Sequence, residues 1–178
     1  GDQGTDLDFG VLERLADVAS ELGDFAEAER LFREAIAVRD ELLERPGGAG
    51  AIVSLGVALV RMQRIDEARG VLSDAARTAR ETGDSAACAL VACHLASLPG
   101  GDPPAAGAEF AAHEPDLAPT ERMEGRLLLW QATHDRTHLA EAKRLLDFLV
   151  EHAPPDCRGP MLANVRLHRE IVAAVKEA

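Results

Sequence analysis

The residues with the most reactive side chains in this sequence are three cysteines and six histidines. Cys88, Cys93 and His94 lie close together, and thiolate and imidazole are ligands that zinc prefers. A zinc finger, however, places paired thiolates two to four residues apart with a second pair downstream, and the sequence lacks that spacing. We therefore expect no metal site and interpret both thiols as small side chains in the core of an apolar helix.

Two further histidines lie four residues apart, which would place both rings on one face of a continuous helix. The surrounding pattern instead predicts a turn at about residues 135–137, so we expect His134 and His138 to be solvated side chains beside that turn. His168 precedes Arg169 and Glu170, and we expect it near the polar face of the last helix.

No set of residues suited to catalysis is visible. The sequence lacks a GxSxG motif, a cysteine with a defined histidine partner and a glycine-rich loop that could hold phosphate. Acidic residues stand beside arginines at helical spacing, as in Glu27/Arg30 and Glu29/Arg33, where ion pairing is a sufficient explanation. We predict no catalytic residue and no cofactor, and a small all-α enzyme is the least favoured alternative.

The elements that carry these residues are amphipathic helices that recur along the chain. A small residue followed four positions later by a large apolar one occurs four times, at Ala28, Ala68, Ala106 and Ala142. The intervals are 40, 38 and 36 residues, and such a period is typical of stacked helix pairs.

This pattern predicts an all-α fold: a right-handed superhelical stack of about four antiparallel helix pairs with a C-terminal capping helix. We expect a single domain over residues 1–178. The expected pairs lie at 9–44, 49–82, 85–114 and 120–153, and the capping helix lies at about 163–177. In that last helix, we expect an apolar stripe to cover the open end of the fourth pair: Val165, Leu167, Ile171 and Val175.

The first two pairs share a finer pattern of large and small residues. The first pair has Leu12, Leu15-Ala16, Gly23-Asp24-Phe25, Ala28, Phe32 and Ala35; the second has Ile52, Leu55-Gly56, Ile65, Ala68, Leu72 and Ala75. With these residues the chain resembles tetratricopeptide repeats. The third pair departs from the family pattern at Cys93-His94 and the fourth at Trp130, where small residues belong. The resemblance implies a non-enzymatic scaffold for protein–protein interaction.

The C-terminal part of the chain, residues 138–172, is similar to the ends of repeat arrays in large bacterial signalling proteins. That resemblance implies an alternative function: a regulatory segment of a signalling ATPase or kinase that packs against its own upstream domain. Because the chain does not begin with methionine, we expect it to be a piece of a longer protein.

Composition limits the classes of partner. The net charge is −12, and no run of basic residues is longer than two, so nucleic acid and anionic membranes are disfavoured as partners. Three cysteines without a disulfide framework fit a reducing compartment, and we expect a cytoplasmic protein.

The inner face of the array is the expected binding surface. Its first-repeat positions hold Glu13 and Asp17, which exclude binding of a C-terminal carboxylate. The later repeats place apolar residues on this face, and we expect it to contact an apolar segment of a protein or peptide, or of a second copy of the chain. The predicted partner-binding residues are Val53, Val57, Val60, Val91 and Leu95.

Overall fold

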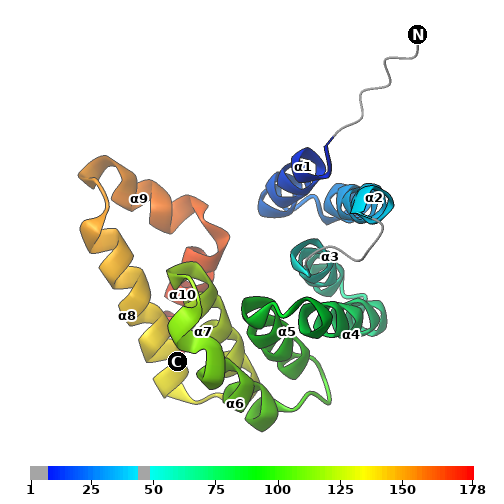
Figure 1. Cartoon of the computed structure of the whole chain (residues 1–178). Helices are drawn as coiled ribbons and strands as arrows, with labels where there is room; N and C mark the ends of the chain where they lie inside the picture. The colour runs from blue at the N-terminus through cyan, green and yellow to red at the C-terminus, as the bar shows by residue number, and fades with distance from the viewer. Residues whose placement is uncertain (1–7, 44–48) are drawn as a thin grey trace. The chain divides into compact units, whose positions relative to one another are not determined.

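The structure, a computed structural model, describes residues 8–43 and 49–178, and these residues are almost entirely helical (Figure 1). They contain no β-strand, so the prediction of an all-α fold is confirmed. None of the described helices is long and apolar enough to cross a membrane. The elements are α1 (Phe9–Leu22), α2 (Phe25–Leu43), α3 (Gly50–Arg61), α4 (Ile65–Thr82), α5 (Ser85–Ser97), α6 (Pro103–His113), η1 (Glu114–Asp116), α7 (Pro119–Thr133), α8 (Arg136–His152), α9 (Pro155–Asn164) and α10 (Arg166–Glu177).

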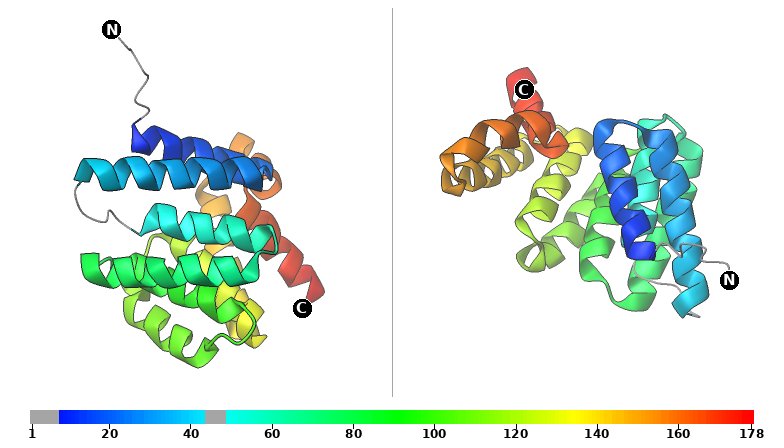
Figure 2. Two further views of the ribbon diagram at one scale, coloured as in Figure 1. Left: turned by 90° about the vertical axis from the view of Figure 1, so that its right-hand side faces the viewer. Right: turned by 90° about the horizontal axis from the view of Figure 1, so that it is seen from above.

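The chain forms two compact units, Gly1–Ala87 and Cys88–Ala178, with the boundary inside α5. Each predicted repeat range covers two consecutive helices, from α1 and α2 to α7 and α8, except that α7 begins one residue earlier, at Pro119. In the first unit, α1 to α4 lie side by side and each runs antiparallel to the next (Figure 2, left). Two earlier predictions depend on how these units are joined: that the chain is a single domain, and that its helix pairs form a right-handed superhelix. Both stay predictions.

Glycine followed by aspartate ends one helix and begins the next at two places. Gly23 and Gly83 take left-handed φ angles of 84° and 71°, which glycine adopts without steric cost. The aspartates that follow cap the next helices: Asp24 accepts a hydrogen bond from the Glu27 amide at 3.2 Å, and Asp84 accepts one from the Ala87 amide at 2.9 Å. Short, rigid turns of this kind fix neighbouring helices as antiparallel pairs.

The core of the first unit is built from alternating large and small side chains. Gly56 on α3 lies so close to α4 that an added Cβ would be 2.7 Å from the Leu72 side chain. An ion pair joins successive pairs on the polar side, where Arg64 Nη1 lies 2.6 Å from Glu29 Oε2. The buried core residues of this cluster are Leu12, Ala16, Ala19, Ala28, Leu31, Phe32, Ala35, Ala51, Leu55, Leu59 and Ala68.

The second unit has its own core, formed by α7, α8 and α10. Trp130, where the fourth pair departs from the family pattern, is half-buried and packs against this core. Helices α6 and α7 approach each other closely at Gly125 on α7, where an added Cβ would be 2.1 Å from the Phe110 ring of α6. The buried members of this core are Met123, Leu127, Leu139, Ala142, Leu145, Leu146, Ile171 and Ala174.

The C-terminal region differs from the prediction. The fourth pair ends at α8, close to the predicted boundary, but Pro155 then begins a separate helix, α9, because proline fits the first turn of a helix. The last helix, α10, starts at Arg166, and Val165 is its exposed N-cap. The predicted apolar stripe is correct only in part: Ile171 is buried in the second core and Leu167 packs against it, whereas Val165 and Val175 are exposed. The other buried residues of α10 are His168 and Ala174.

Candidate functional site

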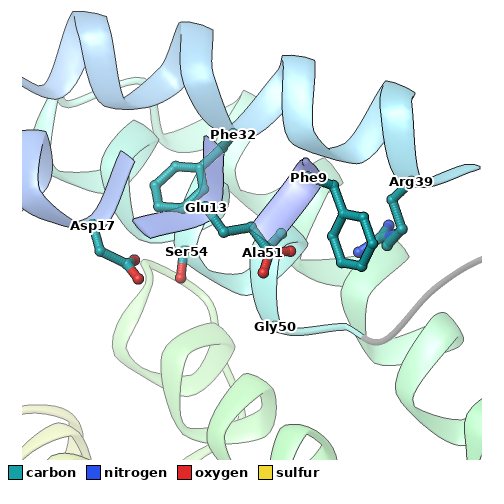
Figure 3. A pocket seen from close by; sticks show the side chains of 8 residues that line it. All are labelled: Phe9, Glu13, Asp17, Phe32, Arg39, Gly50, Ala51 and Ser54. Carbon is teal, nitrogen blue, oxygen red and sulfur yellow. The ribbon is translucent and has the colours of Figure 1, made fainter. Parts of the chain in front are cut away.

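A pocket opens in the first unit where α1, α2 and α3 meet (Figure 3). Its volume is about 400 Å³. Asp17 lies at one end and Phe9 and Arg39 lie at the other, with Glu13 and Ser54 between them. The lining residues are Phe9, Glu13 and Asp17 of α1, Phe32 and Arg39 of α2, and Gly50, Ala51 and Ser54 of α3.

Helical periodicity places the two acidic side chains in this pocket. Glu13 and Asp17 are one turn apart on α1, so their side chains point in the same direction. The residues before them, Leu12 and Ala16, are buried in the core, which leaves the acids on the adjoining face. The pocket therefore combines carboxylates with apolar walls.

Both pocket carboxylates have pKa values above the ordinary range. Burial raises the pKa of Glu13 most, and the charge of Asp17 raises it further, although Arg39 and Arg14 act in the opposite direction. Burial also raises the pKa of Asp17, with a further contribution from Glu21. Each carboxylate has lost hydration that the protein does not fully replace, and a cation in the pocket would stabilise the ionised forms.

Arg39 is the one basic residue among the described residues that line the pocket, and its side chain is only 4% exposed. Its guanidinium donates hydrogen bonds to Asp40 Oδ1 at 3.2 and 3.3 Å. Since a neighbouring carboxylate already faces this cation, the two acids leave the pocket region negative.

Ser54 would need a neighbouring base to act as a nucleophile. Among the lining residues that the structure describes there is no histidine, cysteine or lysine whose imidazole, thiolate or amine could accept the Ser54 proton. In the part of the chain that the structure describes, no group of three or more His, Cys, Asp or Glu side chains is arranged to hold a metal ion.

The predicted partner-binding residues occupy different environments. Val53 and Val57 of α3 and Leu95 of α5 are half-buried, with part of each side chain accessible. Val60 is also half-buried, but it packs against the core of the first unit. Val91 is fully buried, so it is not accessible to a partner; on a helix that is apolar nearly all round, periodicity does not show which face remains open.

The cysteines do not form a reactive centre. Cys93 is fully buried, and burial together with the charge of Glu124 raises the pKa of its thiol to about 12. Cys88 is half-buried and Cys157 is exposed on α9. The expectation of a core thiol is thus confirmed for Cys93 and fits Cys88 only in part.

The histidines are dispersed. His134 ends α7 with a left-handed φ of 57°, and His138 lies in the first turn of α8, so the predicted turn between them is confirmed. His138 Nδ1 lies 3.0 Å from Arg126 Nη1, and burial lowers the pKa of His138. The expectation for His168 was wrong: it is buried, and its Nδ1 lies 3.0 Å from the Met161 carbonyl oxygen, a polar contact that periodicity does not predict.

Sequence reasoning placed Glu13 and Asp17 on the inner face but did not predict a pocket there. The available signal was the pair of acids one turn apart, at positions that the second repeat fills with Val53 and Val57. Phe32 and Arg39 of α2 also line the pocket, but no spacing in the sequence predicted that they would.

Comparison with known proteins identifies a repeat family in the first unit. Residues 9–81 match a family model described as tetratricopeptide repeat, and this range contains α1 to α3 and nearly all of α4. No curated protein and no solved structure gives a significant match.

Proposed function

Because residues 9–81 belong to the tetratricopeptide repeat family, we propose that the chain is a non-catalytic module that binds a peptide or helix of another protein along the inner faces of α1 and α3. Repeats of this family generally mediate protein–protein interaction. The observation that carries the proposal is the pocket, which lies among the inner-face positions of the first repeat; its described lining residues include two carboxylates, Glu13 and Asp17, beside apolar walls.

The apolar part of the proposed face is supplied by Val53 and Val57. They lie one turn apart on α3, so one apolar side of a bound segment can cover both. Because both are already half-buried, covering the remainder contributes on the order of 1 kcal/mol each. Leu95 extends the proposed face onto α5, whereas Val60 and Val91 are too closely packed to contribute.

The pocket adds a charged feature to this recognition. Its two carboxylates carry a desolvation penalty when ionised, and the net charge of the whole chain is −12. A lysine or arginine side chain entering the pocket offsets that penalty, and the walls of Phe9 and Phe32 can contact its methylene groups. The preferred segment therefore has a basic residue next to apolar ones.

Selection from a displayed library of random peptides, followed by calorimetric titration of the enriched sequences, tests this proposal. We expect enrichment of a basic residue flanked by apolar residues. Val57→Arg should weaken binding at least roughly 10-fold, because it places a cation on the apolar face. Asp17→Asn should weaken the binding of basic peptides and leave the binding of uncharged ones unchanged. Ser73→Arg, on an exposed position of α4, is the matched control and should bind as the parent does.

Two results would contradict the proposal. One is that no peptide is enriched with the folded protein. The other is that enriched peptides bind equally well to the parent and to a folded Val57→Arg variant, which would place the contact elsewhere. The bound segment could belong to the same, longer polypeptide or to a separate protein. In both cases its binding should depend on Val57 and Asp17 in the same way.

A further inference from the structure

A stripe of exposed apolar side chains runs along α1 on a face that the pocket does not use. Its members follow one another at intervals of four, three and four residues, the spacing of a single helix face. In chain order the members are Val11 (37% exposed), Leu15 (46%), Val18 (56%) and Leu22 (81%). A continuous row of large apolar side chains at this exposure indicates a surface that another element covers.

The second repeat shows how this register of the helix is normally used. The positions 40 residues later on α3 include Ala51, Leu55 and Ala58, and all three are buried. There α3 packs against α2, the second helix of the preceding pair. On α1 the equivalent positions carry apolar side chains of equal or larger size that remain exposed in the described structure. The stripe on α1 is thus the face that a helix of this repeat normally packs against its neighbour, and in the described residues no helix covers it.

We propose that this stripe is the interface of a homodimer in which α1 of one chain packs antiparallel against α1 of a second copy. With the two-fold axis at the centre of the stripe, Leu15 lies opposite the partner subunit's Val18. In the same register, Val11 lies opposite the partner subunit's Leu22. Every layer then pairs one valine with one leucine, so the stripe is complementary to itself.

The charges beside the stripe support a second copy as the occupant. Arg14 and Glu21 each precede a stripe leucine by one residue, so both lie along the same edge. In a two-fold antiparallel pair, this edge meets the same edge of the partner in the reverse direction. Arg14 therefore faces the partner subunit's Glu21, and the symmetric pair forms at the other end.

The interface is small, so the dimer is weak. Four side chains from each copy bury less than the ~1,200 Å² of a standard interface, and association needs a high protein concentration. Glu13 and Asp17 lie on another face of α1, so the dimer leaves the pocket open. The proposal does not depend on peptide binding, and either can fail without the other.

Sedimentation velocity of the full chain, from about 10 μM to about 1 mM, tests the proposal. We expect a concentration-dependent shift from monomer to dimer. Leu15→Glu should weaken association at least roughly 10-fold, because it buries a charge in the central layer. Leu162→Glu changes a comparably exposed leucine on α9 and should leave association unchanged. Circular dichroism checks that each variant stays folded.

A charge exchange tests the antiparallel arrangement. Arg14→Glu places two acids opposite each other at both ends, and Glu21→Arg places two arginines there, so each variant alone should associate roughly 3- to 10-fold more weakly. An equimolar mixture of the two should regain association, because both ends of the mixed dimer then have opposite charges. A parent protein that is monomeric throughout, a dimer indifferent to Leu15→Glu, or no recovery on mixing would each overturn the proposal.

Discussion

The close approach of α6 and α7 makes Gly125→Ala a sharp test of the packing in the second unit. The new Cβ would lie 2.1 Å from Cε2 of Phe110 and within 2.9 Å of two other ring atoms, whereas non-bonded carbons prefer about 3.5–4.0 Å. Phe110 is 1% exposed, so its ring cannot move into solvent. Overpacking of this kind costs up to about 3 kcal/mol, and the better helix propensity of alanine returns about 1 kcal/mol.

We therefore expect Gly125→Ala to lower the free energy of unfolding by about 2 kcal/mol, which corresponds to a fall in Tm of about 4–8 °C. Thermal unfolding followed by far-UV circular dichroism measures this shift. Gly107→Ala is the matched control, because Gly107 lies on α6 and an added Cβ there meets nothing within 4 Å. That variant should raise Tm by about 2–4 °C through helix propensity alone.

The two substitutions are chemically identical, so opposite signs isolate the contact with Phe110. If Gly125→Ala raised Tm as Gly107→Ala does, the close approach of the two helices would be refuted. A further check is the double variant Gly125→Ala with Phe110→Leu. The smaller side chain should make room for the methyl group, and the two changes should be less destabilising together than the sum of their separate effects.

Three further predictions concern the pocket, the thiols and the terminal helix. Affinity for a basic peptide should fall as the pH is lowered, because protonation removes the negative charge of the pocket acids; since burial raises the pKa of both acids, the fall should begin at a higher pH than for ordinary carboxylates. Titration calorimetry over a pH series measures this, and a Glu13→Gln/Asp17→Asn variant should lose the dependence. In the folded protein, mass spectrometry should find a thiol reagent on exposed Cys157 but not on Cys93, whose buried thiol has a pKa raised to about 12. Ile171→Ala should lower the free energy of unfolding in urea by about 2–5 kcal/mol, since this side chain is fully buried; a similar midpoint for parent and variant would show that α10 does not seal the second core.

Periodicity and turn chemistry predicted most of the fold. Gly23-Asp24 belongs to the repeat pattern, and the same two residues recur at Gly83-Asp84, where the structure also ends one helix and begins the next. Such boundaries are predictable because glycine at a left-handed position and a capping aspartate act locally. Helix α9 was not predicted, although Pro155 suits a helix start, because its ten residues lack the apolar periodicity of the repeats and none of them is buried.

The candidate site was less predictable because it depends on which neighbour covers each helix face. Val53 and Val91 occupy equivalent predicted positions, yet one is half-buried and the other fully buried. Periodicity shows that a helix has an apolar face, but it does not identify the element packed against that face. The pocket needs side chains from three helices at once, and only its two α1 carboxylates had a recognisable spacing.

The position of Trp130 has an optical consequence. The chain has one tryptophan and no tyrosine, and that tryptophan lies on α7 at the edge of the second core, with its ring 6.4 Å from that of His134. Intrinsic tryptophan fluorescence therefore originates in the second unit alone, and the first unit emits no such signal. Far-UV circular dichroism, in contrast, records the helices of both units. A difference between unfolding curves from these two signals would isolate the unfolding of the pocket-bearing unit without any attached label.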